Sequence, residues 1–284
     1  MKKLLIATTA LVLVAGAATA EVKMTGDARF GLSYNSANTV NDFTAEYRVR
    51  AKFNMSGKTD GGLGFGASFI LTGSNNTTTS DATGSSMVWV SGSWGQVSVG
   101  EGVDTGSDSV GLGIADIGYK GIGVDDLAEG LYAASAANIN YTGTFGAITV
   151  GVSYNLPVAG GTAADQDWSI GVGYKGDGFK VALGYDVQEF GVNTLTIGGG
   201  VTMGAISANV IYSMPDAGND AYGVDFGYKL NSATALTVAY ANNGTMDGYG
   251  VGVAYTLGGG AKLVAGIGQV GGDTKAEAGL TFTF

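Results

Sequence analysis

Apolar and polar residues alternate along most of this chain, and this alternation restricts its fold more than any other feature. In residues 221–229, for example, Tyr222, Val224, Phe226 and Tyr228 are each separated by a single residue. Side chains of a strand point alternately to its two faces, so each such segment predicts a β-strand with one apolar face and one polar face. The predicted strands are 22–35, 42–56, 62–72, 85–93, 96–102, 136–143, 147–155, 168–175, 179–188, 194–203, 206–214, 221–229, 234–242, 247–256, 261–269 and 275–284.

The connections between these strands alternate between short and long. The short ones, such as 57–61, 176–178 and 258–260, are rich in glycine, which supplies the positive φ angles of hairpin turns. The long ones include 73–84 and 103–135. Short turns at one end and long loops at the other are typical of an outer-membrane barrel. The even strand number places both ends of the barrel on the short-turn side.

The three arginines indicate which face of the sheet meets lipid. Arg29, Arg48 and Arg50 all fall between the apolar positions of the first two strands, as does Lys52. On the lipid-facing side, an arginine at mid-membrane costs about 2–4 kcal/mol. The apolar faces therefore point outward, and these four residues form a basic wall inside the barrel. Two interpretations of the wall stay open: ordinary solvated charges, or a basic half-ring that shapes the field across a constriction.

The predicted fold is therefore all-β, a 16-stranded antiparallel transmembrane β-barrel. The alternatives are a soluble β-sandwich and a calcium-binding β-solenoid. Paired aromatic residues near both ends of many strands favour the barrel over the sandwich, because such rings lie at the headgroup level of a membrane. The solenoid requires a repeating G-G-x-G-x-D nonapeptide, which the sequence lacks.

Composition excludes several classes of function. The chain has no cysteine and no histidine, which excludes disulfides, thiolate catalysis, histidine-based catalysis and histidine metal sites. We therefore predict that the protein is not an enzyme. Its net charge of −10 also argues against a nucleic-acid partner.

The first twenty residues are predicted to be a cleaved secretory signal. Lys2 and Lys3 precede an apolar run that is too short to span a bilayer, and Ala18-Thr19-Ala20 matches an A-x-A cleavage site. The alternative is a short N-terminal membrane anchor. The predicted organisation is thus a signal at 1–20 and a single barrel domain at 21–284.

The longest connection, 103–135, is too long for a simple surface loop. Its many apolar residues predict that it folds into the barrel and packs against the wall, and we call it the constriction loop. Its carboxylates would then face the arginines across the opening and produce a transverse field. These acidic residues are Asp104, Asp108, Asp116, Asp125, Asp126 and Glu129.

Four of these acids offer oxygen ligands for a hard cation. Asp116, Asp125, Asp126 and Glu129 are one candidate set for Ca²⁺. The competing interpretation is a group of solvated loop carboxylates. No other cofactor is expected.

Two stretches and the last residue resemble a known family. The start Glu21–Arg29, the segment Met55–Phe69 and the terminal Phe284 resemble the general diffusion porins of purple non-sulfur bacteria and their marine relatives. The resemblance implies a homotrimer in outer-membrane lipid and lipopolysaccharide, with one water-filled pore per protomer. It also implies that the third long loop forms an eyelet opposite the basic wall, and that the outer-membrane assembly machinery recognises Phe284.

The expected function is therefore that of an outer-membrane general diffusion porin, a passive channel for small hydrophilic solutes and ions. Members of the family often carry a larger basic cluster, so the three arginines and the acidic loop predict weak cation selectivity here. The alternatives are a substrate-specific channel and a structural, plugged barrel. A specific channel needs aromatic residues in the lumen, and Trp89 is the one exception to the outward parity of the aromatics; a register error or a loop contact is the other explanation for it.

Overall fold

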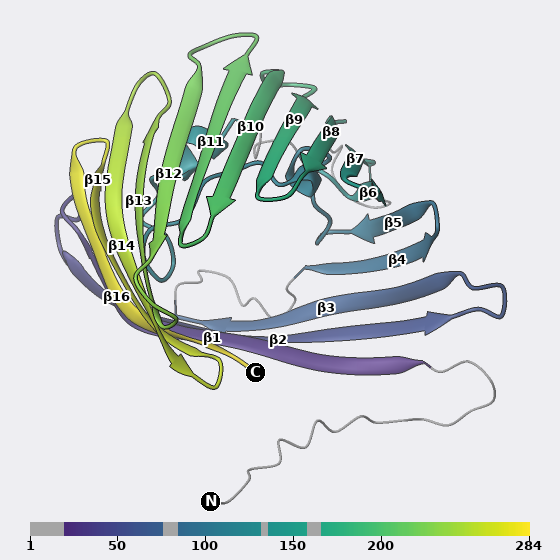
Figure 1. Ribbon diagram of the computed structural model, residues 1–284, viewed down its shortest axis with the longest axis horizontal. Coiled ribbons are helices and arrows are strands. Elements are labelled where there is room, and N and C mark those ends of the chain that lie inside the picture. Colours follow the sequence, from purple (N-terminus) through teal and green to yellow (C-terminus); the bar gives the residue numbers. More distant parts are fainter. Residues whose placement is uncertain (1–19, 76–84, 132–135, 158–165) are drawn as a thin grey trace, which may run out of the picture.

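A computed structural model describes residues 20–75, 85–131, 136–157 and 166–284. Its strands form a closed antiparallel barrel in which each strand pairs with its neighbours in sequence (Figure 1). The strands are β1 (Glu21–Asn35), β2 (Phe43–Lys58), β3 (Gly64–Ser74), β4 (Ser86–Gly92), β5 (Gly95–Gly100), β6 (Ile139–Phe145), β7 (Ile148–Tyr154), β8 (Trp168–Lys175), β9 (Phe179–Val187), β10 (Thr194–Met203), β11 (Ile206–Pro215), β12 (Ala221–Lys229), β13 (Thr234–Asn242), β14 (Asp247–Gly258), β15 (Ala261–Val270) and β16 (Asp273–Thr283).

The barrel closes where β16 pairs with β1. The register runs from Asp27 opposite Thr283 to Asn35 opposite Lys275. The Phe30 and Phe282 rings stack across this seam, with centroids 5.9 Å apart. Closure matters because an open sheet edge would leave backbone N–H and C=O groups unpaired in hydrocarbon. The predicted sixteen-stranded barrel is confirmed.

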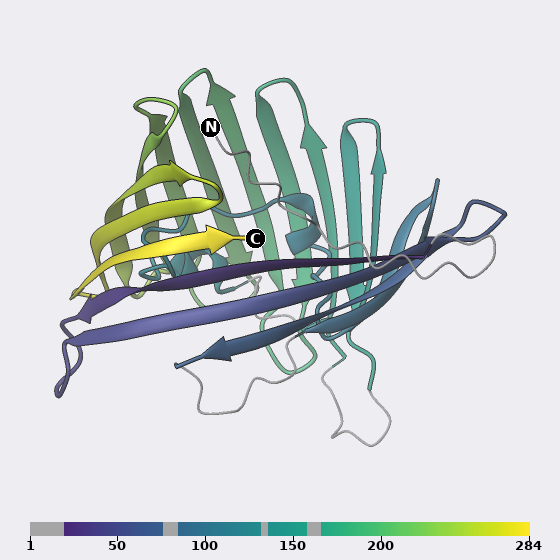
Figure 2. The same ribbon diagram turned by 90° about the horizontal axis from the view of Figure 1, so that it is seen from below.

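Strand boundaries differ from the prediction by a few residues. The strand predicted at 136–143 runs instead over Ile139–Phe145, and the preceding Asn138 donates hydrogen bonds to the carbonyls of Tyr154 and Leu156. The first two strands are the longest, with 15 and 16 residues, and Figure 2 shows them extending along one side of the barrel. No helix in the described part of the chain is long and apolar enough to cross a membrane.

Burial in this barrel is inverted relative to a soluble protein. On β12, Val224 is 44% exposed on the outer face, whereas its neighbour Asp225 is 3% exposed on the inner face. The same parity holds on β1, where Phe30 and Leu32 are exposed and Ser33 is buried. An outer surface of exposed aliphatic and aromatic side chains is what lipid tails require.

The connection between β5 and β6 contains the constriction loop, and its described part lies inside the barrel, as predicted. It carries a 3₁₀ turn, η1 (Asp108–Val110), and one turn of helix, α1 (Asp126–Glu129). Figure 1 shows this teal segment behind β9 to β12. Its apolar side chains pack on the wall in a single buried cluster of Ile117, Ile122, Val124, Leu127, Ala128, Ile211, Ala239 and Ala241.

Glycines on the inner wall let the constriction loop approach closely. A Cβ at Gly171 would lie 2.3 Å from the Gly106 carbonyl oxygen. A Cβ at Gly223 would lie 2.7 Å from Ile114 Cδ1 and 2.8 Å from Ala128 Cβ. Such distances do not occur, so a side chain at either position would displace the loop. Close packing of the loop thus accounts for part of the chain's 51 glycines.

Candidate pore constriction

The basic wall lies on two paired strands. In the β1–β2 register, Arg29 is opposite Arg48, and Asp27 is opposite Arg50. Lys52 follows two residues further along β2 on the same inner face and is exposed. Pairing in register brings the three guanidinium groups together near mid-height of the barrel.

Asp27 holds two of these arginines, a role that sequence reasoning missed. Arg50 donates to both Asp27 oxygens, from Nε at 3.0 and 2.9 Å. Arg48 Nη2 donates to Asp27 Oδ1 at 3.3 Å. The signal was available, because Asp27 has the inward parity and lies beside two cations. The consequence is a wall with a smaller net positive charge than the arginines alone imply.

The first half of the constriction loop is fastened to β7, β8 and β9 by buried hydrogen bonds. The Ser107 hydroxyl donates to Asp186 Oδ2 at 2.6 Å and lies 3.0 Å from Ser169 Oγ. The backbone N–H groups of Gly106 and Ser107 donate to the hydroxyls of Ser153 and Ser169. Ser107, Ser169 and Asp186 are all fully buried. These buried hydrogen bonds fix the path of the loop.

The tip of the constriction loop reaches the basic wall itself. The Tyr119 ring lies against Gly31 and Gly279, and the Arg29 guanidinium sits 6.0 Å from the ring centroid. Burial raises the pKa of Tyr119 above its usual value, which keeps its hydroxyl protonated beside Ser33. The loop therefore runs around the inner wall and contacts β1 and β16, rather than only facing them.

Lys120 anchors the tip through two acids of the wall. Its ammonium group pairs with Glu46 of β2 and lies 4.0 Å from Glu277 of β16. The Lys120 backbone N–H also donates to Glu277 at 3.1 Å. Lys120 is the only basic residue in 103–135, so the sequence singles it out. The sequence does not identify its partners, which lie on distant strands.

The six predicted acids of the constriction loop fall into two groups. Asp125 is 9% exposed, and Glu129 Oε1 accepts a hydrogen bond from the Ile114 backbone N–H. These two carboxylates are therefore part of the packed structure of the loop. The other four remain exposed on the loop surface: Asp104, Asp108, Asp116 and Asp126.

Asp125 is the strongly perturbed carboxyl of the constriction loop. Burial raises its pKa to about 8, and the neighbouring carboxylates of Asp116 and Asp126 act in the same direction. Partial desolvation likewise raises the pKa of Asp108, although this residue is exposed overall. Within the described residues, no group of three or more acidic side chains is arranged to hold a metal ion. The calcium site stays a prediction.

Trp89 lies on the inner face of β4, as its parity implied. Val88 and Val90 on either side are 57% and 40% exposed on the outer face. The indole covers Gly66 of β3, where an added Cβ would lie 2.4 Å from the ring. Trp89 is therefore a wall residue packed against a glycine.

A closed barrel with an apolar exterior, a polar interior and an inward-folded loop is the architecture of a bacterial porin. The model of the Gram-negative porin family matches residues 7–275. The chain belongs to the Gram-negative porin family, and it is a multi-pass β-barrel of the outer membrane.

Individual relatives agree with this assignment. A porin of Rhodobacter capsulatus is 32% identical over 176 residues, which cover 58% of this chain and 56% of that protein. A triple mutant of the Rhodopseudomonas blastica porin superposes with a TM-score of 0.80 at 22% identity, covering 93% of this chain and 100% of that one. A second mutant of the same porin has a TM-score of 0.79 at 20% identity, with the same coverage of both chains. These structures share the fold.

Proposed function

We propose that this protein is a general diffusion porin: a passive, non-enzymatic, water-filled channel for small hydrophilic solutes and ions. The observation that carries the proposal is the inverted burial, with exposed apolar side chains outside and polar side chains inside a closed barrel. Such an interior solvates ions and polar solutes, whereas a catalytic site needs a nucleophile and a base. The chain has neither histidine nor cysteine to build the common ones.

Liposome swelling tests this proposal against a plugged barrel. Vesicles that contain the folded protein should swell in isotonic solutions of small sugars, at rates that fall as the sugar grows larger. Swelling by one sugar only would favour a substrate-specific channel. No swelling by a correctly folded protein would favour the plugged barrel.

We further propose that the channel is weakly cation-selective. Four exposed loop carboxylates contribute negative charge, while Asp27 offsets part of the charge of Arg48 and Arg50. In a planar bilayer with a potassium chloride gradient, the reversal potential should have the sign of potassium permeation. The opposite sign would contradict this part of the proposal.

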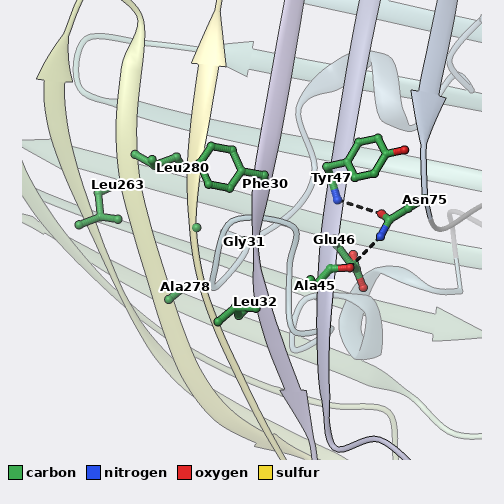
Figure 3. A pocket seen from close by; sticks show the side chains of 11 residues that line it. Phe30, Gly31, Leu32, Ala45, Glu46, Tyr47, Asn75, Leu263, Ala278 and Leu280 are labelled. Atoms are coloured by element: carbon green, nitrogen blue, oxygen red, sulfur yellow. Dashed lines mark hydrogen bonds between the residues drawn. The ribbon is translucent and has the colours of Figure 1, made fainter.

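The oligomer that we propose is a homotrimer, with β1 to β5 at the contact. A hollow of about 530 Å³ lies on the outer face over β1, β2, β15 and β16, and Figure 3 shows Phe30, Leu280 and Tyr47 around it. Asn75 closes its edge by bonding the Tyr47 N–H and the Ala45 carbonyl. Cross-linking in native membranes tests the trimer, since only monomers would be recovered if the copies did not associate.

Three further assignments belong to the same proposal. Residues 1–20 are a cleaved signal, and they lie outside the described residues except for Ala20. Phe284 is the assembly signal, and it is 77% exposed. Loop carboxylates bind Ca²⁺, for which Asp116 and Asp126 are the exposed members of the predicted set. N-terminal sequencing, deletion of Phe284 and calorimetric titration with Ca²⁺ test them in turn.

A further inference from the structure

Lysines are distributed unevenly along the barrel axis. Six of them lie within three residues of the strand ends on the short-turn side, and we call this set the lysine collar. Each of these lysines points into the barrel. The residues next to it on its strand, or next to its cross-strand partner, are exposed apolar residues of the outer face. The lysine collar consists of Lys23, Lys58, Lys175, Lys180, Lys229 and Lys262.

The lysine collar is largely free of ion pairs. Lys180 donates to the Gly111 carbonyl of the constriction loop, a neutral partner. None of the six takes part in an ion pair within the described residues. Three carboxylate side chains share this end of the barrel, Glu21, Asp60 and Asp177. The short-turn mouth therefore keeps a positive excess.

Acidic residues gather at the opposite end. Six exposed carboxylates lie at the long-loop ends of the strands, and we call this set the carboxylate collar. The one strand lysine in this half of the barrel is Lys275, and its ammonium group is bound to the Ile122 carbonyl. The carboxylate collar consists of Asp42, Glu101, Glu189, Asp216, Asp220 and Asp247.

Two collars of opposite sign make the channel electrically asymmetric along its axis. Each mouth concentrates the mobile ion of opposite charge within a Debye length, which is about 10 Å at 0.1 M salt and about 3 Å at 1 M. Rings of charged side chains act in this way in ion channels. The long-loop mouth is therefore enriched in cations, and the short-turn mouth is enriched in anions.

We propose that the open channel rectifies, carrying more current when the long-loop side is positive. With that polarity, cations enter through the cation-rich mouth while anions enter through the anion-rich mouth, and mobile charge accumulates in the lumen. With the reverse polarity, each ion must enter through the mouth that repels it, and the lumen is depleted. The inference rests on the proposed function, because it requires an open, conducting pore.

Current–voltage curves of single channels in planar bilayers test the proposal. At about 0.1 M potassium chloride, the ratio of currents at equal and opposite voltages should exceed one, and at about 1 M it should approach one because the field is screened. Orientation is fixed with Ala217→Cys in the exposed loop after β11, since the chain has no cysteine of its own. An impermeant thiol reagent then identifies the long-loop side.

Variants separate charge from shape as the origin of rectification. The triple variant Lys175→Gln, Lys229→Gln, Lys262→Gln should bring the low-salt ratio close to one. The matched control, with arginine at the same three positions, should keep the wild-type ratio because the charge is retained. A symmetric wild-type channel at low salt, or the opposite polarity, would overturn the inference and leave the diffusion pore intact. A folded protein with no conductance would instead contradict the proposed function itself.

Discussion

At the scale of single residues, Asp27 determines how much positive charge the basic wall presents. One carboxylate accepts hydrogen bonds from Arg48 and Arg50, at side chains that are only partly exposed. A partly buried pair is screened less by salt than a surface pair, so its charge balance persists in the pore. The net charge of Asp27, Arg48 and Arg50 together is thus one positive unit rather than two.

Neutralising Asp27 should move the selectivity toward anions. In Asp27→Asn, both guanidinium charges remain and their counter-charge is gone. In Arg48→Ala with Arg50→Ala, only the carboxylate remains, so cation preference should rise. The anion preference should decrease in the order Asp27→Asn, wild type and the double arginine variant, as read from reversal potentials.

Asp60→Asn is the matched control for this series. It removes the same charge from an exposed turn without touching an arginine, and its reversal potential should stay closer to that of the wild type. Equal shifts for the two asparagine variants would show that net charge alone governs selectivity.

At the scale of elements, the constriction loop depends on glycines in the wall, because a side chain at those positions would occupy the space of the loop. Gly223 of β12 faces Ile114 and the α1 residue Ala128, and both contacts involve loop side chains rather than the barrel backbone. Gly223→Val should push the loop toward the pore axis while leaving strand pairing intact. Single-channel conductance should fall and become noisier.

Gly73→Val is the control for steric displacement of the loop. Gly73 lies on β3, and an added Cβ would meet nothing within 4 Å. The same gain in size and strand propensity should leave conductance unchanged there. A lower conductance in both variants would attribute the effect to the strands and not to the loop.

Docking of the constriction loop should also weaken as pH rises. The pKa of Asp125 is raised from 3.8 to about 8 in the docked loop by burial and its acidic neighbours. A raised pKa means that the docked state binds the extra proton, so docking is strongest below about 4 and weakens as pH rises through about 8. Current noise should therefore increase with a midpoint near this value.

Asp125→Asn gives the test of this assignment. An amide stays neutral at every pH. Current noise in the variant should therefore not depend on pH between about 5 and 9, the range that contains the wild-type transition. A wild-type transition that survives in Asp125→Asn would place the titrating group elsewhere.

Several parts of this element were predictable from the sequence, and others were not. Period-two alternation and turn glycines predict the strands, because both signals are local. The cost of an arginine in lipid predicts the direction of Arg29, Arg48 and Arg50. The partners of Lys120 and Ser107 were not predictable, since Glu46, Glu277 and Asp186 are brought to them only by the path of the loop around the wall.

At the scale of the whole molecule, the barrel is stable in a membrane because its two faces are not interchangeable. Val238 and Thr237 are adjacent at the centre of β13, yet Val238 is 45% exposed on the outer face and Thr237 points inward. An inward arginine remains in a polar lumen, whereas an outward one must be placed in hydrocarbon or deform the bilayer.

Val238→Arg should therefore lower the free energy of unfolding from lipid vesicles by about 2–4 kcal/mol, while Thr237→Arg changes it much less. Reversible denaturant titration in vesicles, followed by tryptophan fluorescence, measures both. The two substitutions introduce the same side chain one residue apart, so propensity and net charge cancel in the comparison. Equal destabilisation would mean that the outer face of β13 is covered by protein or water rather than by lipid tails, and the oligomer contact would then have to include β13.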